Sequence, residues 1–251
     1  MYIKTEAIVL REVDINEADK LLDLLSKDQG LLTVKARGVR RSNSPLRSAC
    51  QFLVLSEYTL QEYRGRYTVQ EAVPLEQFQS IRRSLNLLAL GTYFAQAAGT
   101  VAQADAPNPE LLSLLCNAIY AMGSLKKPEP LVKAAFELRL ACLAGFTPNL
   151  EACPVCGSET PDRFDLSQGT VTCAGCREGR TGIRLPINAG MLMALRYIVW
   201  CDPKRLFSFR LDDDSLREFN SLTEGYLMTQ LEHSFYTLDF YKSLLQIGET
   251  L

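Results

Sequence analysis

Residues 21–37, LLDLLSKDQGLLTVKAR, hold two apolar segments separated by a polar turn, and they decide how the N-terminal part of the chain folds. Segments 21–26 and 31–37 are rich in apolar residues, as β-strands are. The tetrapeptide Lys27-Asp28-Gln29-Gly30 between them supplies turn residues, and Gly30 can adopt a positive φ at no steric cost. The pattern predicts an antiparallel hairpin.

Three further strands are expected on either side of this hairpin. Segment 3–13 begins with alternating residues, and segments 52–62 and 67–73 flank a second hairpin turn, Tyr63-Arg64-Gly65-Arg66. Five strands within about 75 residues are typical of a small closed barrel such as an OB-fold. A small open sheet or an SH3-like barrel leaves a similar pattern, so the strands alone do not choose among the three.

From Ser80 onward the apolar residues recur with a helical period. Pro109 is placed to open a helix and Gly145 to end one. We therefore predict an α+β multidomain chain, with a barrel domain over 1–79 and a helical domain over 80–251. Segment 84–104 carries no charge, but its polar residues and many alanines favour a buried helix over a membrane span. The helices are expected at 84–103, 110–125, 131–144, 188–200, 213–232 and 238–247.

Four cysteines form the most specific motif of the sequence. Cys153 and Cys156 make one C-x2-C pair, and sixteen residues later Cys173 and Cys176 make a second. Two such pairs at this spacing are typical of a structural zinc site with four thiolate ligands. Because four thiolates leave no open position, we expect one structural Zn²⁺ per chain in a zinc-finger-like insert over 150–184. The segments Phe164-Asp165-Leu166 and Thr170-Val171-Thr172 are expected to pair as a short hairpin between the cysteines.

Composition argues against several classes of protein. Lys plus Arg is 27 and Asp plus Glu is 29, so any nucleic-acid-binding surface must be a local basic patch. The chain has one histidine, His233, without a recognisable nucleophile or carboxylate around it, and neither a phosphate loop nor a dinucleotide fingerprint occurs. We therefore expect no enzyme activity and no nucleotide cofactor. The acidic run Asp212-Asp213-Asp214 is interpreted as a helix cap rather than a metal site. The charged N-terminus is unlike a signal peptide, which favours the cytoplasm.

A basic loop follows the strand at 31–37. Its five cations fall within thirteen residues that contain no acid, and two arginines on the later hairpin lie near tyrosines. Cations that contact phosphates, with aromatic rings that stack on bases, are how OB-folds hold single strands. A solvated loop that binds nothing is the equally weighted alternative. The predicted DNA contacts are Lys35, Arg37, Arg40, Arg41, Arg47, Arg64 and Arg66.

Several segments together resemble the bacterial RecO family of DNA repair and recombination mediators. They include Ala7-Ile8-Val9-Leu10, the run from Asn16 to Leu21, and Lys35-Ala36-Arg37-Gly38-Val39-Arg40-Arg41. In the helical part, Phe136-Glu137-Leu138-Arg139-Leu140 is followed by Gly145-Phe146-Thr147-Pro148, and the four cysteines come next, in the order that the family shows.

The resemblance implies an N-terminal OB-fold, a helical domain and the zinc-finger-like insert. It implies a non-catalytic protein that binds single- and double-stranded DNA, anneals complementary strands and, with RecR, helps load RecA on strands coated by single-strand-binding protein. Such a protein would be associated with the nucleoid. The acidic, apolar C-terminal tail of single-strand-binding protein is expected to dock on the helical domain, where Lys133, Phe136 and Arg139 are the candidate contacts.

Two other functions compete with this one. In the first, the chain is a zinc-stabilised interaction adaptor whose DNA contact is incidental. In the second, it is a metal-dependent hydrolase, which the closed four-thiolate site argues against.

Overall fold

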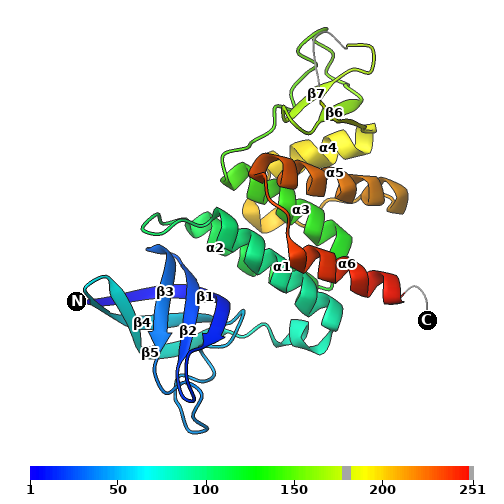
Figure 1. Cartoon of the computed structure of the whole chain (residues 1–251). Helices are drawn as coiled ribbons and strands as arrows, with labels where there is room; N and C mark the ends of the chain where they lie inside the picture. Colours follow the sequence, from blue (N-terminus) through cyan, green and yellow to red (C-terminus); the bar gives the residue numbers. More distant parts are fainter. Residues whose placement is uncertain (177–181, 249–251) are drawn as a thin grey trace. The chain divides into compact units, whose positions relative to one another are not determined.

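A computed structural model describes residues 1–176 and 182–248 (Figure 1). Contacts divide the chain into two compact units. Unit 1 comprises Met1–Ser124 and Phe235–Leu251, and unit 2 comprises Leu125–Ser234. The sequence placed everything after residue 79 in one helical domain, whereas the contacts group three of the helices with the barrel.

Antiparallel pairs and one parallel pair close the N-terminal segment into a five-stranded barrel with strand order β1-β2-β3-β5-β4. The barrel closes where the third strand pairs in parallel with the fifth, with Val34 opposite Tyr67 and Lys35 opposite Thr68. Alternate residues point inward, and Leu22, Leu24 and Tyr58 lie fully buried in its core. The closed barrel confirms the five predicted strands and excludes the open sheet. The strands are β1 (Tyr2–Asp14), β2 (Lys20–Ser26), β3 (Gly30–Ala36), β4 (Leu55–Tyr63) and β5 (Arg66–Glu76).

Both predicted hairpin turns use left-handed backbone. Gly30 has φ +68°, and the β4–β5 turn places Arg64 at φ +51° and Gly65 at φ +74°. Two consecutive positive φ values match the twist of a two-residue hairpin.

The helices of unit 1 are grouped with the barrel by their contacts. Ser84 caps α1 by accepting a hydrogen bond from the Leu87 amide, and Asn108 caps α2 through the Leu111 amide. The last helix, α6, returns from the far end of the sequence to pack on α1, and the ring centroids of Tyr93 and Phe235 lie 5.4 Å apart there. The bounds are η1 (Gln79–Arg83), α1 (Leu85–Val101), α2 (Pro109–Gly123) and α6 (Tyr236–Gly248).

Unit 2 is built on the packing of α3 against α5, with α4 beside them. Asp212 accepts a hydrogen bond from the Ser215 amide at 2.9 Å, which confirms that the acidic run caps a helix. Among the described residues, no helix has the length and apolar character needed to cross a bilayer. The bounds are α3 (Glu129–Leu143), α4 (Ala189–Trp200), η2 (Pro203–Arg205) and α5 (Asp213–Leu231).

A three-stranded sheet of order β7-β6-β8 forms the cysteine-containing insert between α3 and α4. The hairpin of β6 (Arg163–Asp165) and β7 (Thr170–Thr172) was predicted, and β8 (Arg184–Pro186) was not. Residues 177–181 of the predicted 150–184 insert lie outside the described residues.

Candidate metal centre and nucleic-acid interface

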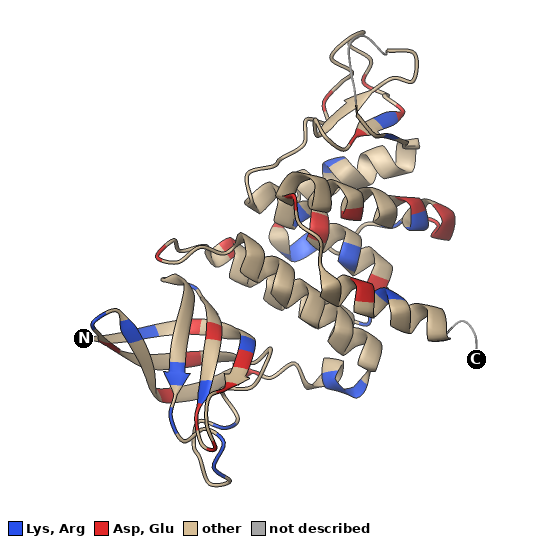
Figure 2. Cartoon of the chain, viewed as in Figure 1, with Lys and Arg blue, Asp and Glu red and all other residues tan. Residues whose placement is uncertain are grey.

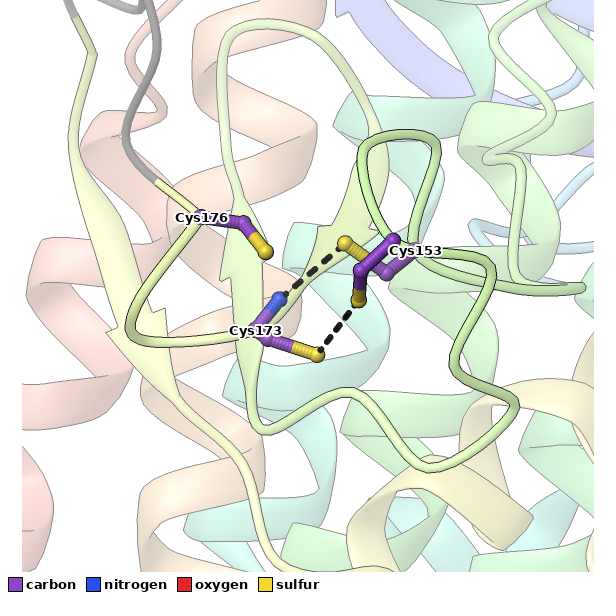
Figure 3. A group of neighbouring side chains, drawn as sticks. Cys153, Cys173 and Cys176 are labelled. Carbon is purple, nitrogen blue, oxygen red and sulfur yellow. Dashed lines mark hydrogen bonds between the residues drawn. The ribbon is translucent and has the colours of Figure 1, made fainter.

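The four cysteines of the two C-x2-C pairs come together in space. Cys153 and Cys156 lie on the loop before β6, while Cys173 and Cys176 follow β7. Their sulfur atoms all lie within 4.8 Å of one another, and Figure 3 shows the side chains of Cys153, Cys173 and Cys176 turned toward one another. The Sγ atoms of Cys156 and Cys173 are 3.6 Å apart. A tetrahedral zinc site with Zn–S bonds of about 2.3 Å needs sulfurs about 3.8 Å apart, so the donor set fits that metal.

Local backbone hydrogen bonds shape each cysteine pair. The Gly157 amide donates to the Cys153 carbonyl at 2.8 Å, and the Cys176 amide donates to the Cys173 carbonyl at 3.0 Å. Gly157 has φ +72°, a conformation that residues with a Cβ rarely adopt. The Cys173 amide also donates to Cys153 Sγ at 3.4 Å, which joins the two pairs.

The electrostatics of the cluster call for a cation. Burial on its own raises the pKa of the Cys153 thiol, but the backbone amides of Cys156, Cys173 and Val155 lower it to about 6. The pKa of Cys176 is raised to about 12, first by its hydrogen bond with Cys156 and then by desolvation and by the nearby Cys153 sulfur. The Cys153 thiolate thus forms readily, and its charge opposes ionisation of Cys173 and Cys176. A divalent cation removes that opposition because it stabilises all four thiolates together.

Residues outside the motif hold the metal centre in place. Arg196 of α4 donates to the carbonyls of Leu150, Glu151 and Glu159 at 2.7–3.0 Å, which fixes the loop that carries the first cysteine pair. Asp162 accepts from the Ala174 amide at 2.7 Å. Sequence reasoning missed both residues, because neither lies at motif spacing from the cysteines.

The basic loop begins at the end of β3, where Asp19 organises its base. Asp19 Oδ1 accepts from the Gly38 amide at 2.8 Å, and Oδ2 pairs with Lys35 Nζ at 3.0 Å. These contacts, the Gly38 amide first, lower the pKa of Asp19 to about 2. Arg40 pairs with Asp14 at 3.2 Å and donates to the Asn16 carbonyl at 2.6 Å. Lys35 and Arg40 are therefore already paired with carboxylates, Asp19 in the β1–β2 turn and Asp14 at the end of β1.

Three other arginines of the loop remain exposed. The side chains of Arg37, Arg41 and Arg47 form no ion pair with any described residue. On the β4–β5 hairpin, Arg64 lies over the Tyr63 ring at 5.2 Å, and Arg66 is exposed. Figure 2 shows basic and acidic positions interspersed on the barrel strands. Of these five arginines, all but Arg66, the first residue of β5, lie in loops.

Strand pairing links the two predicted groups of DNA contacts. Because Lys35 of β3 pairs with Thr68 of β5, the start of β5 with Arg66 lies beside the end of β3. Inward-facing Val34 and Val69 are buried, so Lys35 and Arg66 lie on the outer face of neighbouring strands.

The three predicted peptide contacts on α3 make contacts within unit 2, and two of them are buried there. Phe136 is 0% exposed and Lys133 is 5% exposed, so neither side chain is accessible to a docked peptide in this conformation. Lys133 Nζ lies 2.8 Å from Glu137 and 2.9 Å from Glu224. Desolvation lowers the pKa of Lys133, but the two carboxylates outweigh it and raise that pKa. The partly exposed Arg139 donates to the Cys201 carbonyl at 2.8 Å.

Comparison with known proteins agrees with this combination of barrel, helical part and cysteine cluster. Residues 1–78 match the family model "Recombination protein O N terminal", and residues 82–239 match "Recombination protein O C terminal". A protein named "DNA repair protein RecO" from Acetivibrio thermocellus is 32% identical over 98% of both chains. A protein of the same name from Desulforudis audaxviator is 32% identical over 96% of both chains. Another, from Caldanaerobacter subterraneus, is 28% identical over 95% of this chain and 97% of the relative.

The fold and the site thus define a DNA repair protein with an N-terminal OB-fold and a helical part that carries a four-cysteine module. The chain belongs to the RecO family.

Proposed function

We propose that this chain binds single- and double-stranded DNA through its barrel and anneals complementary strands, without catalysing a chemical reaction. The observation that carries the proposal is the set of exposed arginines Arg37, Arg41 and Arg47, none of which is paired with a described carboxylate. An unpaired cation can neutralise a DNA phosphate and release its counterions. Lys35 and Arg40 are already paired with carboxylates, so each must give up that ion pair before it can bind a phosphate. Arg64 and Arg66 extend the same surface along the β4–β5 hairpin.

The metal of the cysteine cluster is Zn²⁺ in this proposal. Zinc supplies a closed tetrahedral crosslink and no chemistry of its own at such a site. The three strands of the insert have only three residues each, so the metal adds stability that so small a module cannot obtain from its core alone.

The partners in this proposal are RecR and single-strand-binding protein, and the process is the loading of RecA on coated strands. The acidic tail of single-strand-binding protein docks on the helical part of the chain. Its contacts must include surface residues other than Lys133 and Phe136, because those two side chains are buried.

A salt titration of DNA affinity tests the proposal. The protein is titrated against a labelled single strand by fluorescence anisotropy, and an Arg37→Gln, Arg41→Gln, Arg47→Gln variant is compared with wild type. Each lost phosphate contact reduces the slope of log K against log salt by about 0.7, so three reduce it by about two units. Strand annealing is expected to slow in the same variant.

The control variant carries Lys4→Gln, Arg11→Gln and Lys27→Gln. It loses the same charge from the same barrel, but all three cations are paired with carboxylates on the strands. Its slope should stay close to that of wild type. If the slope of log K against log salt falls by the same amount in both variants, the loop is not the DNA surface. If neither variant nor wild type binds in a salt-dependent way, the adaptor function replaces this one.

A further inference from the structure

The single tryptophan of the chain lies on the surface of unit 2. Trp200 is the last residue of α4, and its side chain is 57% exposed. Large aromatic side chains are usually mostly buried, because they carry the greatest apolar area of any residue. An exposed indole at a helix end is therefore an unusual feature that the family fold does not require for its core.

Trp200 is one of the residues that line an open pocket of about 570 Å³. Its lining consists of Tyr197, Trp200, Cys201, Asp202, Lys204 and Arg205. The volume falls in the range of roughly 300–1,000 Å³ that is common for ligand sites.

The backbone of the pocket is fixed in place. Pro203 begins the short helix η2, and Asp202 caps it by accepting from the Lys204 amide at 2.8 Å. Tyr197 Oη donates to the Arg205 carbonyl at 2.6 Å. The Tyr197 ring in turn packs on Phe209, with centroids 6.3 Å apart. The turn after Trp200 is thus held by hydrogen bonds and ring contacts before any ligand binds.

Two unpaired cations lie at this pocket. Lys204 and Arg205 are exposed, and neither side chain forms an ion pair with any residue that the structure describes. Asp202 Oδ1 accepts from the Lys204 amide, and this carboxylate is paired with neither cation. The pocket therefore offers one exposed aromatic face, two unpaired cations and one carboxylate, which leaves a net positive charge.

We propose that Trp200, Lys204 and Arg205 form a second contact for single-stranded nucleic acid, in which a base stacks on the indole and the cations hold adjacent phosphates. Stacking platforms flanked by cations bind single strands in this way without reading sequence. The proposal rests on the proposed DNA-binding function and adds a site in unit 2 to the one on the barrel.

An acidic peptide is the rival occupant, and the lining favours it less. A peptide that anchors an apolar side chain needs a deep apolar groove. Here three of the six lining residues are charged, and the hydroxyl end of Tyr197 is tied to the backbone.

The unique tryptophan provides a direct test. Intrinsic fluorescence of the full chain, with its metal bound, is followed while oligo(dT) is added, and anisotropy of a labelled oligonucleotide reports total binding in parallel. We expect saturable quenching of Trp200 emission. Trp200→Ala should weaken binding about tenfold, and Trp200→Phe should retain most of the affinity. Lys204→Gln with Arg205→Gln should reduce the salt slope by about 1.4 and reduce the quenching.

A matched control removes two other exposed cations of unit 2, through Lys126→Gln and Arg217→Gln. It should leave both the quenching and the slope close to those of wild type. Anisotropy that reports binding while Trp200 emission stays constant overturns this inference and leaves the barrel function intact. Emission that responds to an acidic, apolar peptide and not to oligo(dT) also overturns it. Absence of binding in both measurements contradicts the proposed function as well.

Discussion

Gly30 combines a backbone requirement with a close contact. Its φ of +68° favours glycine, and a Cβ at this position would press against the Gln103 and Ala106 carbonyls of unit 1. Gly65 has a similar φ of +74°, but a Cβ added there would meet nothing within 4 Å, so it is the matched control.

We expect Gly30→Ala to lower the free energy of unfolding by about 3 kcal/mol, of which about 1–2 kcal/mol comes from the left-handed backbone alone. Gly65→Ala should cost about 1 kcal/mol. Urea unfolding of both variants measures the difference. Equal losses would show that the contact with residues 103–106 contributes nothing.

Asp19 makes the base of the basic loop sensitive to acid. Its folded pKa of about 2 lies below the ordinary value of 3.8. A depressed carboxyl pKa contributes stability that is present above about pH 3.8 and is lost as the pH falls toward 2. We expect the side-chain carboxyl of Asp19 to titrate near 2 in an NMR experiment. Asp19→Asn should abolish this part of the acid dependence, and a midpoint near 3.8 in the wild type would contradict the contacts with Gly38 and Lys35.

Lys133 illustrates what a residue pattern cannot reveal. Its spacing from Phe136 and Arg139 is that of an amphipathic helix with solvated cations, yet α3 is buried on nearly every side. The partner that decides this is Glu224, which lies 91 residues further along the chain and reaches Lys133 only after α3 packs on α5.

Lys133→Met removes the cation that Glu137 and Glu224 share. We expect a loss of about 3 kcal/mol at neutral pH, because buried carboxylates then lack their counter-charge. The loss should shrink as the pH falls, because protonation removes the uncompensated charge of these buried carboxylates. Thermal unfolding across pH checks this, and a loss that does not vary with pH would argue that packing alone is responsible.

At the scale of elements, the predicted bounds agree closely where short-range chemistry sets them. Prolines and capping residues fixed the starts of α2, α4 and α5 to within a residue or two of the structure. The strand β8 escaped prediction because its three residues include Pro186 and pair only with β6, about twenty residues earlier. The clustering of the four cysteines was predictable, because the spacing of the two pairs is itself the signal.

The cysteine module should depend on its metal. We expect one zinc per chain by metal analysis, and loss of that zinc in Cys153→Ser and in Cys176→Ser. Structural zinc is worth on the order of 10 kcal/mol in small peptides, so residues 150–176 and 182–186 should become sensitive to protease in these variants or after chelation. The barrel should unfold at an unchanged denaturant concentration. Cys116→Ala, outside the module, should retain zinc. A full complement of zinc in the Cys176→Ser variant would contradict the four-thiolate site.

At the scale of the whole molecule, the chain returns to unit 1 at its end. Local sequence predicts α6 as a helix but not its neighbour, because α1 lies about 140 residues earlier and no motif joins them. Three large side chains at the start of α6, Phe235, Leu238 and Tyr241, are at most 3% exposed, and Phe235 packs on the Tyr93 ring. Unit 1 is therefore complete only when the last helix has docked.

A chain that ends after Ser234 tests this dependence. Each fully buried side chain of this size contributes about 2 kcal/mol, so unit 1 should lose several kcal/mol while unit 2 retains its stability. Hydrogen exchange measured by segment should show lost protection in α1 and unchanged protection in α3 and α5, since α1 loses the helix that covers it. A chain that ends after Gly248 keeps the buried side chains and should behave as the full chain does. If α1 retained its protection without α6, the two helices would be stable independently, and the division of the chain into these units would not describe how it unfolds.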